Sequence, residues 1–108
     1  LKIASDLGEL QKYNLEKGIG KRYAILIGIN KYADSGLSPL SKARNDAKAL
    51  HQILKKNGGF DNIALMTDDV DPSNTERLFP TRENIQNKVQ SFLNGAEPND
   101  MFVFFFSG

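Results

Sequence analysis

Apolar residues form three uninterrupted runs along the chain, separated by two segments whose apolar residues are spaced as in helices. These runs lie within residues 23–30, 62–67 and 101–106. Polar residues occur at the ends of these ranges and do not alternate with the apolar ones. Runs of this kind are typical of strands that are covered on both faces, as in the middle of a parallel sheet. We therefore predict three strands, of which the first and the last are buried, and the last begins near Met101.

The two intervening segments predict amphipathic helices. From Ser41 onwards, apolar residues follow one another at spacings of four, three and four, which places them on one helical face: Ala43, Ala47, Leu50 and Leu54. Gly58-Gly59 ends this helix, because glycine tolerates a left-handed backbone. Thr81 is a favourable N-cap for the second helix, whose apolar face consists of Ile85, Val89, Phe92 and Leu93.

The order strand, helix, strand, helix, strand predicts an α/β fold with a mostly parallel sheet. An all-apolar last strand needs a neighbour on each side, so we expect more polypeptide to complete the sheet. Residues 1–21 are predicted to be an N-terminal extension or linker. Within it, Ser5 can cap a short helix carrying Leu7, Leu10 and Tyr13, and residues 17–22 look like a flexible exit.

Composition and charge narrow the functional classes. The 108 residues fit one small domain or part of a larger one, and 40% hydrophobic with 25% charged residues is typical of a globular protein. The net charge is +1, without a basic stripe or a long apolar run, so we expect neither nucleic acid nor a membrane as partner. The chain also has no signal-peptide pattern, which favours a cytoplasmic location.

Few residues offer nucleophilic or metal-binding chemistry. The cysteine count is zero, which excludes disulfides, thiolate metal sites and a thiolate nucleophile within this chain. The single histidine, His51, flanks the apolar stripe of the first helix, and we interpret it as structural.

An acidic run, Asp68, Asp69 and Asp71, has some likeness to a calcium loop. The match fails because Asn74 and Pro80 stand where that loop requires Gly and Glu. We interpret the run as a solvated loop.

Four segments in the same order resemble the caspase-like cysteine peptidases (peptidase C14), and within them the metacaspase and bacterial branch. They are residues 22–32, 40–47 with its Asn-Asp-Ala, 80–85, and 100–108, which ends in Ser-Gly. The resemblance implies a caspase-like three-layer αβα sandwich, of which this chain supplies roughly the first three strands and two helices. On this reading, residues 22–108 are the N-terminal, incomplete part of a catalytic domain.

The same resemblance implies a cysteine endopeptidase whose catalytic dyad lies outside this chain. In the family, His directly follows the Ser-Gly and Cys ends the next strand, so we expect His after Gly108 and Cys further on. The partner is then the remainder of the catalytic domain, in the same chain or in a second, cleaved chain, together with a peptide substrate. Many such enzymes depend on calcium, for which the implied ligands also lie beyond Gly108.

Three residues of this chain are implied in substrate binding. From spacing alone, Asp46 is an acid in a first helical turn that stabilises the helix dipole. The resemblance instead implies that it lines the pocket for an Arg or Lys side chain preceding the scissile bond. Ser107 is implied beside the same pocket, although it equally fits a strand end before a glycine turn. Gly108 would lie near the oxyanion site, and Arg44 leaves open a specificity for acidic residues.

Two alternatives remain at this point. The protein can be a non-catalytic pseudo-peptidase that acts as a scaffold or regulator. It can also be a flavodoxin-like phosphate or nucleotide binder, since fold does not fix function. The second alternative predicts a phosphate-gripping glycine-rich loop after the first strand, and residues 30–36 match one poorly.

Overall fold

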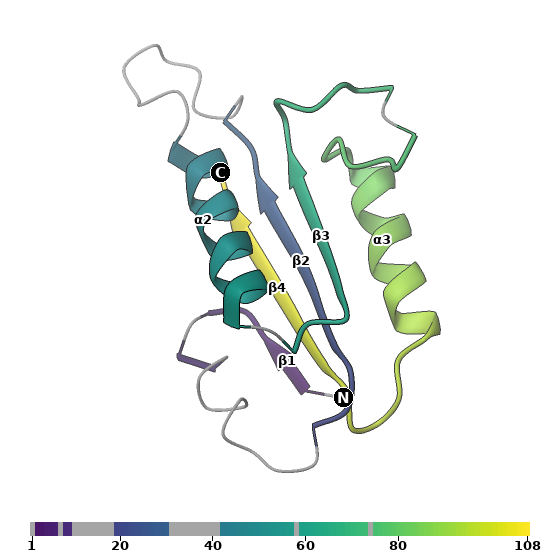
Figure 1. The fold of residues 1–108 in the computed structure, drawn as a ribbon. Helices are drawn as coiled ribbons and strands as arrows, with labels where there is room; N and C mark the ends of the chain where they lie inside the picture. Colours follow the sequence, from purple (N-terminus) through teal and green to yellow (C-terminus); the bar gives the residue numbers. More distant parts are fainter. Residues whose placement is uncertain (1, 7, 10–18, 31–41, 58, 74) are drawn as a thin grey trace.

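The computed structural model describes residues 2–6, 8–9, 19–30, 42–57, 59–73 and 75–108. Within these ranges four strands form one sheet, β1 (Lys2–Ala4), β2 (Arg22–Gly28), β3 (Asn62–Thr67) and β4 (Met101–Ser107). The strand order is β1-β4-β2-β3, and every neighbouring pair is parallel. With the helices α2 (Lys42–Asn57) and α3 (Arg82–Asn94), this is the predicted α/β architecture (Figure 1). No helix in the described part of the chain has the length and apolarity needed to cross a membrane.

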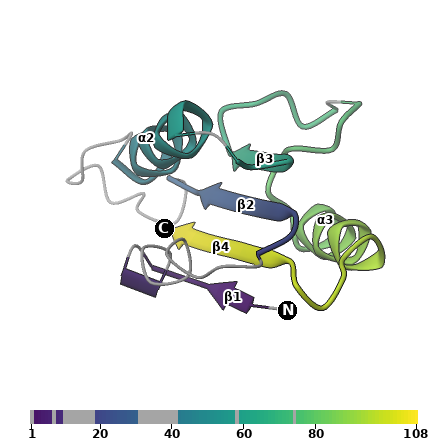
Figure 2. The same ribbon diagram turned by 60° about the horizontal axis from the view of Figure 1, so that its bottom comes forward.

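The two helices cover opposite faces of the sheet, which gives three layers (Figure 2). Side chains of β2 alternate between the faces: Ala24 and Leu26 pack in a core cluster with α2, whereas Ile25 and Ile27 pack in a second cluster against α3. All four predicted apolar residues of α2 are buried, because they form the single stripe that faces the sheet: Ala43, Ala47, Leu50 and Leu54. The layers agree with the sandwich that the resemblance implied.

The last strand is less enclosed than its uninterrupted apolar run predicted. Met101 to Val103 are buried, but Phe104 and Phe105 are only partly buried and Phe106 is 52% exposed. The reason lies in the pairing, because β1 is short and pairs only with the buried first half of β4. Towards Ser107, β2 is the one neighbouring strand that the described residues provide.

The N-terminal residues contribute to the sheet, which the prediction of an extension or linker did not include. Residues 2–4 form β1, and Ala4 is completely buried in the cluster on the α2 side. A strand of three residues is too short to show a periodic pattern, which explains why it was missed. Gly8 and Glu9 are helical, and Asp6 rather than Ser5 caps them by accepting the Glu9 N–H at 2.8 Å. Leu7, Leu10 and Tyr13 of the predicted helix lie outside the described residues.

The amino ends of β2 and β4 are joined by the buried Asp100 carboxylate. It accepts the N–H groups of Lys21 and Glu97, each at 2.8 Å. Gly20 is needed beside it, because a Cβ there would lie 2.5 Å from Asp100 Oδ1. Residues 20–22 are therefore held in place by hydrogen bonds, and the prediction of a flexible exit is wrong for them.

The hydrogen bonds to Asp100 predict a pH-dependent contribution to stability. The Glu97 N–H, followed by the N–H and charge of Lys21, lowers the pKa of Asp100 below its ordinary value. Since the folded state favours the carboxylate, the contribution is full above the ordinary aspartate pKa of about 3.9 and is lost as the pH falls through the lowered pKa. We expect Asp100→Asn to lower the urea midpoint of the full-length protein at pH 7. The difference from the wild type should shrink steadily below pH 4, and a constant difference would contradict this origin.

Candidate functional site

Asp46 and Ser107 meet at the carboxyl edge of the sheet. Because residues alternate along β4, Ser107 lies on the same face as Met101 and Val103, which pack in the cluster with α2. Its hydroxyl donates a long hydrogen bond of 3.4 Å to Asp46 Oδ2, across 61 residues of sequence. Figure 1 shows the chain end at Gly108 beside the first turns of α2. Two of the three candidate residues are thus in contact, at the edge where open parallel sheets bind ligands.

The carboxylate of Asp46 is exposed and faces solvent beside this strand end. Since α2 begins at Lys42, Asp46 lies just beyond the first helical turn. The sequence had predicted that it lies within that turn. The helix dipole therefore stabilises its charge less than expected, because that effect fades within one turn. An exposed carboxylate at this edge can accept two hydrogen bonds from a guanidinium group or pair with an ammonium group.

Gly108 follows the end of β4 and is exposed. The ladder between β2 and β4 continues up to it, because the Ile29 N–H donates to the Ser107 carbonyl at 3.0 Å. A Cβ at position 108 would lie 2.9 Å from the Phe106 ring, an exposed side chain that has room to move aside.

Gly28 allows α2 to lie directly against the end of β2. A Cβ at this position would lie only 2.5 Å from the Ala43 carbonyl oxygen and 3.0 Å from Ala47 Cβ. Real Cβ atoms do not approach a backbone oxygen so closely, so any side chain here would push the helix away from the sheet. The absence of a side chain at Gly28 therefore helps to place Asp46 beside Ser107.

A buried ionic cluster at the same edge joins the ends of β2 and β3 to the first turn of α2. Asp68 Oδ1 accepts the Arg44 Nε–H at 2.6 Å, and Asp68 Oδ2 accepts the Asn30 N–H at 3.1 Å. Asn30 Oδ1 in turn accepts the Arg44 N–H at 2.9 Å. The Asp68 side chain is only 2% exposed, so its interpretation as part of a solvated loop is wrong. The sequence contains one signal for this cluster: Asp68 is a polar residue directly after a parallel strand.

The next carboxylate forms a separate and more exposed ion pair. Asp69 binds Lys48 Nζ at 2.6 Å and accepts the Thr67 hydroxyl at 2.5 Å. The Lys48 hydrogen bond, followed by that of Thr67, lowers the pKa of Asp69. Arg44 and Lys48, one helical turn apart, thus bind the two adjacent carboxylates that follow β3.

The acidic run does not assemble a metal site. Asp71 accepts the N–H and hydroxyl of Ser73 at 2.9 and 2.8 Å in an exposed turn, as expected of a solvated residue. Within the described ranges, no three His, Cys, Asp or Glu side chains come together as a metal would require. Asp68 and Asp69 are bound to Arg44 and Lys48, so these residues do not fit calcium.

His51 lies on α2 and is partly buried. Burial, followed by the charge of Lys55, lowers its pKa, which favours the neutral imidazole. Its structural role stays a prediction.

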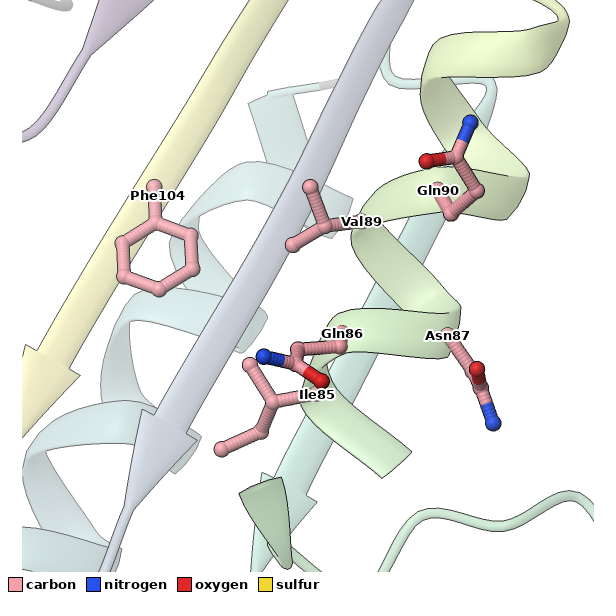
Figure 3. A pocket seen from close by; sticks show the side chains of 6 residues that line it. All are labelled: Ile85, Gln86, Asn87, Val89, Gln90 and Phe104. Atoms are coloured by element: carbon pink, nitrogen blue, oxygen red, sulfur yellow. The ribbon is translucent and has the colours of Figure 1, made fainter. Parts of the chain in front are cut away.

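A hollow of about 530 Å³ lies between α3 and β4 (Figure 3). Ile85 and Val89 extend from α3 toward Phe104, which lies on the face of β4 opposite that of Ser107. The side chains that line it include no titratable group: Ile85, Gln86, Asn87, Val89, Gln90 and Phe104. The hollow is therefore separate from the Asp46–Ser107 edge and offers no acid–base chemistry.

Comparisons with known proteins match this chain to one family. Residues 22–108 match the family described as "Metacaspase, peptidase C14 domain". Metacaspase-1 of Meyerozyma guilliermondii is 35% identical over 98 residues, which cover 89% of this chain and 23% of that protein. Metacaspase-1 of Candida albicans is 36% identical over 101 residues, covering 93% of this chain and 21% of that protein. Metacaspase-1A of Aspergillus terreus is 34% identical over an aligned length of 110 residues, covering 98% of this chain and 26% of that protein.

The chain thus spans about a quarter of the length of these curated relatives. The family match covers residues 22–108, from the start of β2 to Gly108, and so includes the candidate edge. On the family match and on these identities, the chain belongs to the metacaspase, peptidase C14 family.

Proposed function

We propose that this chain is the N-terminal portion of a caspase-like cysteine endopeptidase that cleaves peptide bonds after Arg or Lys. The observation that carries the specificity is the pairing of charges on α2. Asp46 presents an exposed carboxylate at the carboxyl edge, whereas the Arg44 charge is already neutralised by the buried Asp68. The edge thus offers a negative charge to a substrate side chain.

In this proposal, the residues of this chain bind and orient the substrate. Asp46 accepts two hydrogen bonds from an Arg side chain or pairs with a Lys ammonium group. The Ser107 hydroxyl, which contacts Asp46 Oδ2, restrains the carboxylate. Gly108 leaves room for the scissile peptide at the end of β4.

The bond-breaking groups come from the polypeptide that follows Gly108, in the same chain or in a second one. A Cys thiolate attacks the scissile carbonyl, and a His imidazole transfers the proton to the leaving amine. Backbone N–H groups stabilise the oxyanion that forms. Any dependence on calcium belongs to that same polypeptide.

The alternatives receive less support. Specificity for acidic residues would need a free Arg44 guanidinium, but its Nε donates to Asp68 at 2.6 Å. A phosphate site in an open parallel sheet is expected at the carboxyl ends of the strands. Residues 31–36 lie outside the described residues.

The test is cleavage of fluorogenic peptides by the full-length protein, with Arg, Lys or Asp preceding the scissile bond. We expect cleavage after Arg and Lys, and a fall in kcat/KM of about 100-fold in Asp46→Asn, because the substrate cation loses its partner. The matched control is Asp71→Asn, which removes an exposed carboxylate that accepts hydrogen bonds from Ser73, two residues away. Cleavage after Arg that survives unchanged in Asp46→Asn would overturn the pocket assignment. A full-length protein without hydrolytic activity would favour the pseudo-peptidase.

A further inference from the structure

Asp68, Asn30 and Arg44 form a closed ring of hydrogen bonds between three elements. Asp68 follows β3, Asn30 lies two residues after β2, and Arg44 is in the first turn of α2. Each residue contacts both others: Asp68 binds Asn30 N and Arg44 Nε, and Asn30 Oδ1 binds Arg44 N. No pair of these elements can shift at this edge without breaking at least one of the three bonds.

The burial of the Asp68 carboxylate strengthens the hydrogen bonds of this ring. The Asp68 side chain is 2% exposed and the Arg44 side chain 24% exposed. Charge-assisted hydrogen bonds are about twice as strong as neutral ones, and a buried site screens them less than water does. If Arg44 moved, the buried Asp68 carboxylate would lose a charge-assisted hydrogen bond, which is unfavourable. The start of α2 is therefore held in one place relative to the two strand ends.

Asp46 follows Arg44 by two residues on the same helix, so the ring determines where its carboxylate lies. The contact between Asp46 and Ser107 is long, at 3.4 Å, and both groups are near solvent. Such a contact is too weak to hold the helix by itself. We propose that Asp68 is a positioning residue for the substrate-binding carboxylate of Asp46, acting through Arg44 and Asn30. This inference rests on the proposed function of Asp46.

The neighbouring Asp69 provides a matched control within the same turn. It also binds a basic residue of α2, but Lys48 and Asp69 are 46% and 34% exposed at their side chains. Exposed ion pairs of this kind contribute little to structure. If any carboxylate at the end of β3 were sufficient, Asp69 would matter as much as Asp68.

The experiment compares Asp68→Asn with Asp69→Asn in the full-length protein, using peptides with Arg before the scissile bond and active-site titration to count folded enzyme. We expect Asp68→Asn to raise KM about tenfold and to change kcat by less than about twofold, because a misplaced carboxylate weakens substrate binding and leaves the reacting groups in place. Asp69→Asn should change neither constant by more than about twofold. An unchanged KM in Asp68→Asn, or equal effects of the two variants, would overturn the proposal.

A second variant and a second measurement keep the test decisive. If Asp68→Asn does not fold, Arg44→Lys keeps the opposite charge but lacks the Nε donor, and we expect its KM to rise about threefold. Amide hydrogen exchange reports on the ring independently of activity. Faster exchange at the Asn30 and Arg44 N–H groups in Asp68→Asn supports the ring, and unchanged exchange refutes it. If the wild type does not cleave after Arg or Lys, the proposed function fails by itself, and exchange still decides whether Asp68 fixes the start of α2.

Discussion

Replacing Arg44 with methionine is expected to destabilise the full-length protein by about 3–5 kcal/mol, the range found when a buried ion pair loses one partner. Arg44 supplies the guanidinium that binds Asp68 at 2.6 Å, and the Asp68 side chain is only 2% exposed. Methionine keeps much of the aliphatic packing of arginine but removes the guanidinium group that binds this carboxylate. The measurement is urea unfolding at pH 7, with the free energy of unfolding taken from the midpoint and slope.

Two comparisons test the origin of this effect. Lys48→Met removes the exposed cation one turn further along α2 and should cost no more than about 1 kcal/mol. The double variant Arg44→Met with Asp68→Leu should be less destabilised than the sum of its two single variants, because neither charge of the pair remains. If the effects of the two single variants simply add, the ion pair is not the cause.

Replacing Gly28 with alanine is expected to destabilise the protein by about 3 kcal/mol, at the upper end of the usual cost of overpacking a core. The new Cβ would lie 2.5 Å from the Ala43 carbonyl oxygen, which is backbone and has no rotamer with which to move aside. The helix must then move away from β2, and Asp46 moves with it. The measurement is the free energy of unfolding in urea together with KM for peptides with Arg before the scissile bond.

Gly95→Ala is the matched control for this prediction. A Cβ at position 95 would meet Tyr23 Oη at 3.7 Å and the Phe92 carbonyl oxygen at 3.9 Å, both ordinary contacts. The backbone of Gly95 is also right-handed, with φ at −96°, so alanine fits without strain. We expect a change of less than about 0.5 kcal/mol, as for most substitutions that touch nothing critical. Equal effects at both positions would show that Gly28 is not a point of close approach.

The sequence was sufficient to locate the helices and the strands β2, β3 and β4, because the signals for these elements are local. The apolar stripe that includes Ala47 and Leu50 predicted α2, and Thr81 predicted the start of α3, where its Oγ1 accepts the Asn84 N–H at 3.0 Å. The uninterrupted run in β2 predicted a strand buried on both faces, and Ile25 and Leu26 are completely buried. The resemblance pointed to Asp46 and Ser107, which the structure brings within 3.4 Å.

Features that depend on distant neighbours were harder to predict from the sequence. Phe106 belongs to the same apolar run as the buried Phe102, but β1 pairs only with the first half of β4 and leaves Phe106 exposed. Residues 2–4 have no periodic pattern of their own, and they become a strand because Met101 to Val103 offer them hydrogen bonds. Pairing of this kind is a property of two segments, and neither segment shows it alone.

The sequence by itself thus determined the strands and helices of the main sheet, the absence of a thiolate nucleophile in this chain, and the residues worth testing for substrate binding. Only the tertiary structure decided which charges are neutralised and which remain available. Asp46 and Asp68 are the same residue type near the ends of elements, yet Asp68 is buried against Arg44 and Asp46 is exposed beside Ser107. The physical reason is that burial and pairing depend on contacts across 24 and 61 residues of sequence, which form only when the parallel strands align their carboxyl ends at one edge.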